Sequence, residues 1–157
     1  MRSEHLLALA RASLESGSGR PSQAALCRAV STAYYAMFHA LARNCADLLI
    51  GKTPAARSRQ AWSKTYRSLE HGRAKAACAN EKAMRQFPLA IQDFGGILTN
   101  MQSRRHQADY DPVARFTKIE VVSDIDRVAR AIVNFDRLDN REKRAFCAHV
   151  LFRPREP

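Results

Sequence analysis

Hydrophobic residues along this chain recur every three or four positions, the spacing that places side chains on one face of an α-helix. Over residues 3–15 this spacing follows Ser3, a candidate N-cap, and ends before Gly17. A longer segment, residues 22–50, ends at Gly51 and keeps a seven-residue rhythm of apolar positions: Cys27, Val30, Tyr34, Met37, Leu41 and Leu48. Its length of about seven to eight turns predicts the central helix of a bundle.

A third helix is predicted over residues 54–79, which carry Trp62, Tyr66 and Leu69 on one helical face. Gly72 weakens this helix, because glycine in a helix interior costs roughly 1 kcal/mol relative to alanine. We therefore expect Gly72 to be the place where this segment splits, if it splits at all.

A fourth helix covers residues 88–110 and ends at Asp111-Pro112, because proline disfavours helical geometry in the residue before it. Its paired glycines, Gly95 and Gly96, have two interpretations. They either weaken the helix, as Gly72 does, or permit another helix to approach closely.

The spacing of Thr117 and Glu120 is that of a capping box and predicts the start of a fifth helix. Its apolar stripe consists of Val121, Ile125, Val128, Ile132 and Phe135. A short helix over residues 141–151 follows. Because no strand-like alternation and no fixed repeat occur, we expect one all-α domain over residues 1–157. Its architecture is an antiparallel helical bundle of four to five main helices plus a short C-terminal helix.

Basic residues outnumber acidic residues by 26 to 15, which gives a net charge of +11. Nine basic and two acidic residues place +7 of this surplus within residues 52–85. Such a surface favours a polyanionic partner, with RNA or DNA ahead of an anionic membrane. The candidate phosphate contacts are Arg57, Arg59, Lys64, Arg67 and Arg104. The alternative is a solvated face that serves solubility, with Trp62 and Tyr66 in the core rather than stacked on bases.

The four cysteines, Cys27, Cys45, Cys78 and Cys147, show no C-x-x-C spacing and no metal-finger pattern. We interpret them as small core residues in a reducing compartment, and we expect neither a metal nor another cofactor. No apolar run approaches the ~20 residues of a membrane span, and the first residues lack the layout of a signal peptide. A cytoplasmic protein without a membrane partner is therefore expected.

The helix over residues 88–110 closes on polar side chains that continue its apolar stripe of Ile91, Phe94, Leu98 and Met101. At about 100° per residue, Arg105 continues this stripe, and Asp109 lies within roughly 50° of its centre. Arg104 and His106 project to its sides. An isolated buried charge is expensive, so Arg105 and Asp109 must be paired or used in chemistry.

Two stretches resemble the HEPN domain family (higher eukaryotes and prokaryotes nucleotide-binding). Residues 29–41 contain Ala-Tyr-Tyr-Ala-Met-Phe-His, similar to the family's A-Y-Y-A-x-F-H helix, and Arg105-x-x-Ala108-Asp109-Tyr110 is similar to its R-x-x-A-D-Y helix end. The resemblance spans about residues 5–137 and leaves a helical tail, residues 138–157, outside it. It implies a bundle that dimerises, with the polar helix end facing its two-fold mate.

Many members of the family are RNA-cleaving toxins, often paired with a minimal nucleotidyltransferase antitoxin. Ribonuclease members carry an arginine, then four to six intervening residues, then a histidine, and counting from Arg104 or Arg105 no histidine stands there in this chain. The candidate catalytic set is therefore Arg105 as the cation, His106 or Asp109 as the proton carrier, and Tyr110. The alternative is that Arg105 and Asp109 form a buried ion pair at a dimer interface.

Together these features predict a dimeric RNA-binding protein of a toxin–antitoxin or defence system, with metal-independent endoribonuclease activity as its candidate chemistry. Two alternatives stay open: a catalytically silent partner of a nucleotidyltransferase, and a nucleotide- or RNA-binding adaptor. His39 is expected to pack or to lie at the surface, unless it faces Arg105. We expect Tyr34, Tyr35 and Tyr110 to be half-buried, with partners for their hydroxyl groups.

Overall fold

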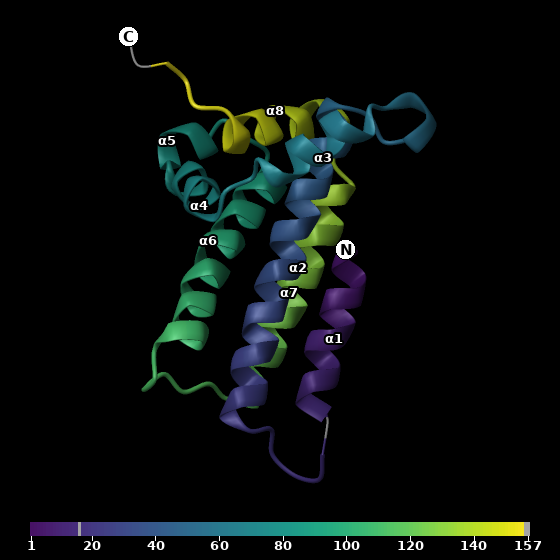
Figure 1. The fold of residues 1–157 in the computed structure, drawn as a ribbon. Coiled ribbons are helices and arrows are strands. Elements are labelled where there is room, and N and C mark those ends of the chain that lie inside the picture. Colours follow the sequence, from purple (N-terminus) through teal and green to yellow (C-terminus); the bar gives the residue numbers. More distant parts are fainter. Residues whose placement is uncertain (16, 156–157) are drawn as a thin grey trace.

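The computed structural model describes residues 1–15 and 17–155, and within them it contains eight α-helices, one short 3-10 helix and no strand (Figure 1). The α-helices are α1 (Ser3–Glu15), α2 (Gln23–Leu49), α3 (Arg59–Arg67), α4 (His71–Ala79), α5 (Glu81–Met84), α6 (Leu89–Tyr110), α7 (Lys118–Asp136) and α8 (Asn140–Leu151). The 3-10 helix, η1, covers Pro54–Ala56. The prediction of an all-α helical bundle is confirmed.

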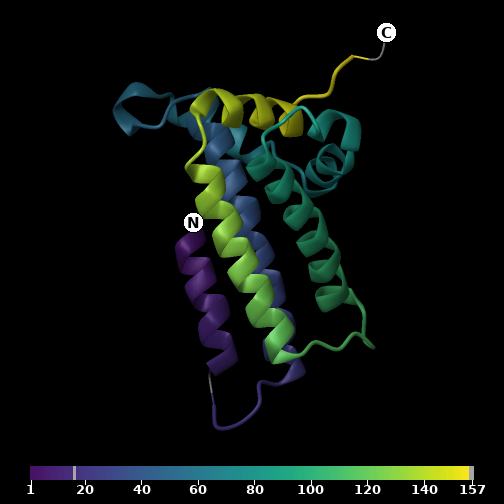
Figure 2. The same cartoon turned by 180° about the vertical axis from the view of Figure 1, so that it is seen from behind.

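Four long helices, α1, α2, α6 and α7, run lengthwise beside one another, and α8 crosses one end of them near α3, α4 and α5 (Figures 1 and 2). The helix α2 contacts α1, α3, α6, α7 and α8, so it is the central element, as its length predicted. Ser22 caps its start by accepting a hydrogen bond from the backbone N–H of Ala25. The capping box of Thr117 and Glu120 is present at the start of α7.

The segment predicted as one helix over residues 54–79 is divided differently from the expectation. It contains η1, α3 and α4, and the break lies at Ser68–Glu70 rather than at Gly72, which belongs to the first turn of α4. Leu69 is buried at the break, and Glu70 has an extended backbone conformation. Burial of Leu69 therefore explains the position of the break better than the conformational freedom of glycine does.

One hydrophobic core runs through the bundle and includes α8. Phe94 of α6, Phe135 of α7 and Phe146 of α8 meet with ring centroids 4.7–6.2 Å apart. Three of the four cysteines are buried as free thiols, and Cys27 is half-buried. Their interpretation as small core residues is thus confirmed for Cys45, Cys78 and Cys147.

Gly95 lies where α4 and α5 press against α6. A Cβ atom at Gly95 would stand 2.7 Å from Cε of Met84 and 3.3 Å from Cβ of Cys78, whereas one at Gly96 would meet nothing within 4 Å. The interpretation of a close helix approach is therefore right for Gly95 alone. This packing fixes the position of α4, which carries His71 at its first turn.

No helix in the described ranges combines the length and the apolar character that a membrane crossing requires.

Candidate functional site

The polar end of α6 meets α2 in a short chain of contacts. Nη1 of Arg105 lies 3.3 Å from Oδ2 of Asp109, and the hydroxyl of Ser31 on α2 donates to Oδ1 of the same carboxylate. The Arg105 side chain is 13% exposed and that of Asp109 is 30% exposed. The predicted inward direction of Arg105 is confirmed, but Asp109 lies at the surface rather than in the core.

The guanidinium of Arg105 faces two aromatic rings of α2. Its Cζ atom lies 5.3 Å from the ring centre of Tyr34 and 5.8 Å from that of Tyr35, distances at which a cation interacts with an aromatic face. Its Nε atom is buried and has no hydrogen-bond partner among the described residues. Arg105 therefore has a buried N–H group without an acceptor among the described residues, a state that costs about 1–3 kcal/mol.

His71, which no sequence pattern connected to this site, contacts the rings of Tyr34 and Tyr35 as well. Its Nδ1 atom is 2.6 Å from the hydroxyl of Tyr34, its ring stacks on Phe38 at 3.9 Å, and its ring centroid is 5.9 Å from that of Tyr35. Burial, together with the charge of Arg105 and the neighbouring His39, lowers the pKa of His71. Burial raises the pKa of Tyr34, so its hydroxyl keeps its proton.

A second tyrosine–histidine pair lies next to the first. Nδ1 of His39 is 2.6 Å from the hydroxyl of Tyr66 on α3, and the two rings stack. His39 is therefore a packing residue whose hydrogen-bond partner is Tyr66, as the first of the two expectations had it, and this bond does not involve Arg105. Burial lowers the pKa of His39, and both pairs tie the segment from α3 to α4 onto α2.

The stack continues from Tyr66 to Trp62, whose indole N–H donates to Asp47 at 2.8 Å. Arg57 lies over the Trp62 ring at 4.3 Å and forms an ion pair with the same carboxylate at 3.2 Å. Both aromatic residues are half-buried against α2. Arg57, a candidate phosphate contact, is therefore engaged within the protein.

His106 and Tyr110 face away from this cluster. Both residues are exposed, and their rings lie 4.9 Å apart on the outer side of α6. Tyr110 is 67% exposed, so its expected half-burial is wrong. The structure thus divides the sequence-derived catalytic set into two groups, with Arg105 and Asp109 on the α2 side and His106 and Tyr110 toward solvent.

Arg104 turns toward α7 and makes a buried ionic contact that the sequence did not indicate. Its Nε atom lies 2.5 Å from Oδ2 of Asp124, a carboxylate that also binds Arg127 at 2.9 Å. Asp124 is buried, and Arg104 lies over the Phe116 ring at 5.1 Å. Arg104, a candidate phosphate contact, is therefore engaged in an ion pair within the protein.

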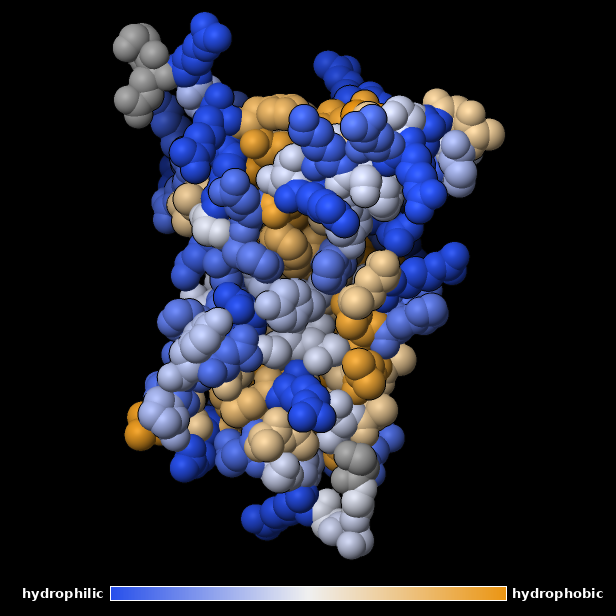
Figure 3. Space-filling view, in the orientation of Figure 1, coloured by the Kyte–Doolittle hydropathy of each residue, from blue (hydrophilic) through white to orange (hydrophobic). Residues whose placement is uncertain are grey.

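Three candidate phosphate contacts, Arg59, Lys64 and Arg67, are exposed on α3. Lys64 and Arg67 border a shallow hollow together with Gln60, Ser63 and Ser68. On the face seen in Figure 3, hydrophilic side chains surround paler and hydrophobic ones that run down its middle over α2. The exposed positive charge of α3 thus lies beside α2.

Within the described ranges, no three His, Cys, Asp or Glu side chains are grouped closely enough to hold a metal ion. Comparison with known proteins found no matching family model, no matching curated protein and no matching solved structure.

Proposed function

We propose that this chain binds RNA, and that Arg105 contacts a phosphate of the bound strand. The observation that carries this proposal is the position of Arg105: its guanidinium lies at the polar end of α6, over the rings of Tyr34 and Tyr35 and beside His71. A phosphate oxygen is the acceptor that a guanidinium fork fits best. The ring of Tyr35, which is half-buried, offers a face on which a base of the same strand can stack.

Two further features support a nucleic acid as the partner. The net charge of +11 favours a polyanion, and Arg59, Lys64 and Arg67 are exposed beside the α2 surface. The resemblance of residues 29–41 and 105–110 to the HEPN family points to the same partner. The buried free thiols fit a reducing compartment such as the cytoplasm.

The proposal includes a homodimer formed along α2 and α6. Ser31 and Tyr35 are half-buried and Asp109 is exposed along this seam, and a two-fold mate would bring a second Arg105 to it. Sedimentation should give about 35 kDa, twice the chain mass of 17.6 kDa. A monomer at micromolar concentration would remove the shared site from the proposal.

The candidate reaction is metal-independent cleavage of the RNA, in which the nucleophile is a hydroxyl group of the RNA itself. The ribose 2′-oxygen attacks the adjacent phosphorus, the bond to the 5′-oxygen breaks, and a 2′,3′-cyclic phosphate and a 5′-hydroxyl form. The 2′-hydroxyl proton needs an acceptor, the leaving 5′-oxygen needs a donor, and the charge that builds on phosphorus needs a cation. Arg105 is the cation in this proposal, and the exposed imidazole of His106, from either subunit, is the candidate proton carrier.

The second candidate function is a catalytically silent helical partner of a nucleotidyltransferase within a toxin–antitoxin pair. It is favoured by the ion pair of Arg105 with Asp109 and by the exposed position of His106, away from Arg105. In this function the α2–α6 seam serves as a protein interface. RNA binding by the isolated chain separates the two candidates.

The variant Arg105→Ala tests the proposal. Arg11→Ala is the matched control, because Arg11 also pairs with a carboxylate, that of Asp126 on α7, but through a side chain that is 47% exposed. We expect Arg105→Ala to weaken RNA binding by about tenfold, the loss typical of a charged hydrogen bond. Arg11→Ala should leave the affinity unchanged. Circular dichroism checks that both variants fold, and chelator-treated protein incubated with RNA measures cleavage. A wild-type protein that does not bind RNA would refute the proposal.

A further inference from the structure

We propose that His71 is a second phosphate-binding residue beside Arg105, and that it acts as a neutral hydrogen-bond donor through Nε2. This inference rests on the proposed RNA binding and names the groups that recognise the phosphodiester. It differs from a general-base function, in which the imidazole would accept a proton.

The first step is the direction of the hydrogen bond between Tyr34 and His71. Tyr34 is fully buried, and Nδ1 of His71 is the partner of its hydroxyl among the described residues. A buried hydroxyl that has one acceptor within reach donates to it, because an unpaired buried O–H costs about 1–3 kcal/mol. The Tyr34 hydroxyl therefore donates to Nδ1.

The second step is the position of the imidazole proton. When Nδ1 accepts a hydrogen bond, a neutral ring must carry its proton on Nε2. The ring stays neutral because it is partly buried and lies near positive charge. The titratable and charged groups that face it are Tyr34, Tyr35 and His39 of α2 and Arg105 of α6.

The third step is the availability of Nε2. No hydrogen bond to another described residue involves this atom, and it is not among the buried polar atoms that lack a partner, so it reaches solvent. Phe38 stacked on one side and Tyr35 set edge-on restrict the ring to this orientation. His71 thus presents a fixed N–H group, and its ring contacts the same two tyrosine rings as the guanidinium of Arg105 does.

The chemistry of the pair indicates an anion with several oxygen acceptors. Arg105 supplies the positive charge, and a neutral N–H adds a directed hydrogen bond without the repulsion that a second cation would bring. A phosphodiester meets this requirement with its two non-bridging oxygens.

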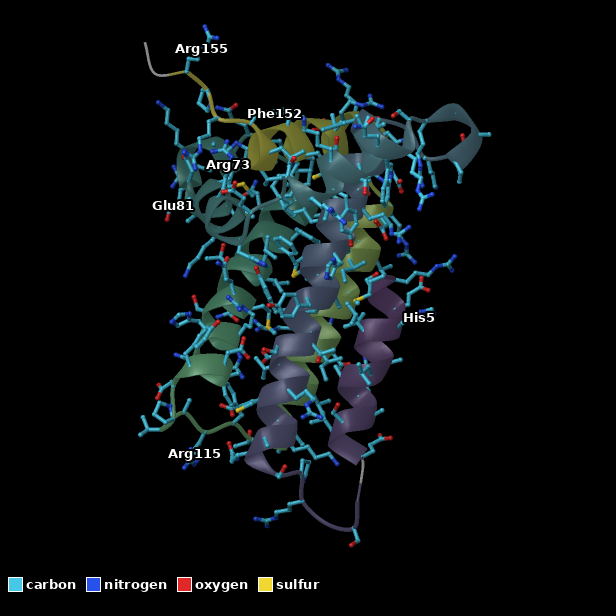
Figure 4. All side chains as sticks on the ribbon, in the orientation of Figure 1. His5, Arg73, Glu81, Arg115, Phe152 and Arg155 are labelled. Atoms are coloured by element: carbon cyan, nitrogen blue, oxygen red, sulfur yellow. The ribbon has the colours of Figure 1, made fainter. Side chains whose placement is uncertain are left out.

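The test uses a 2′-O-methyl oligoribonucleotide, which binds as RNA does but lacks the attacking hydroxyl. His71→Ala should weaken its binding by about tenfold, the effect of one hydrogen bond to a charged group. His71→Gln should retain most of the affinity, because the glutamine amide can place an N–H group near the position of Nε2. His5→Ala is the control, since His5 lies on α1, on the other side of α2 from α6 (Figure 4).

Nitrogen-15 NMR of the histidine rings provides a measurement independent of binding. We expect the neutral His71 ring to carry its proton on Nε2, and we expect Tyr34→Phe to remove this fixed preference. A ring protonated on Nδ1, or equal binding by wild type and His71→Ala, would overturn the inference while leaving RNA binding at Arg105 intact. Failure of the wild-type protein to bind the oligonucleotide would instead overturn the proposed function.

Discussion

Replacing Gly95 with alanine tests the packing that holds α4, and with it His71, against α6. In a helix interior this change should stabilise the fold by about 1 kcal/mol, because alanine restricts the unfolded chain more than glycine does. At Gly95, however, the new methyl group would stand 2.7 Å from Cε of Met84 and 3.3 Å from Cβ and Sγ of Cys78. The end of the Met84 side chain can move, but Cβ of Cys78 is fixed to the backbone of α4.

Overpacking of this kind costs about 1–3 kcal/mol, so Gly95→Ala should range from neutral to a loss of about 2 kcal/mol. Gly96→Ala is the matched control, because its methyl group meets nothing within 4 Å and should give the full gain. The two variants should therefore differ by about 1–3 kcal/mol in the free energy of unfolding, measured by urea denaturation. Equal stabilisation by both would refute the close approach of α4 and α5 to α6.

Asp124→Ala should lower the free energy of unfolding by about 3 kcal/mol, because it leaves the largely buried Arg104 without its carboxylate partner. Asp126→Ala, which breaks an exposed ion pair with Arg11, should cost less than about 1 kcal/mol. Similar losses for the two variants in urea denaturation would contradict the burial of Asp124. Because the pKa values of His39 and His71 are lowered in the folded state, the unfolded chain binds more protons below about pH 6.5, and stability should fall as the pH drops through that value. Each unit by which a histidine pKa is lowered corresponds to about 1.4 kcal/mol in the free energy of unfolding. A His39→Gln/His71→Gln double variant should flatten this part of the profile of stability against pH. An unchanged profile would contradict the tyrosine–histidine pairs. Changing Arg59, Lys64 and Arg67 to glutamate should weaken RNA binding without changing the helical circular dichroism. An unchanged affinity would show that these charges serve solubility rather than RNA binding.

The helices that the sequence predicted well are those with local signals at their ends. The Thr117–Glu120 capping box starts α7 as expected, and Asp111-Pro112 follows the last residue of α6. Caps and prolines act within one turn, so they are readable without knowledge of the rest of the fold. The break at Leu69 depends instead on burial against other helices, which no local pattern reports.

The candidate site was predictable only in part, for a similar reason. Periodicity along α6 placed Arg105 inward, because one helix alone determines that direction. Arg104 projects from the same helix toward Asp124, 20 residues further along the chain. Only the packing of α7 against α6 shows that this carboxylate lies within reach of Arg104. His71 joins Arg105 through the rings of α2 and the position of α4, so its place required the three-dimensional structure.

The salt dependence of RNA binding by wild type and Arg105→Ala tests the central claim most directly. Each contact between a cation and a phosphate of single-stranded RNA contributes about 0.7 to the slope of log affinity against log salt concentration. If Arg105 contacts a phosphate, its loss should reduce the magnitude of the wild-type slope by about 0.7, while Arg11→Ala leaves the slope unchanged. Identical slopes for wild type and a folded Arg105→Ala variant would contradict a phosphate contact at Arg105.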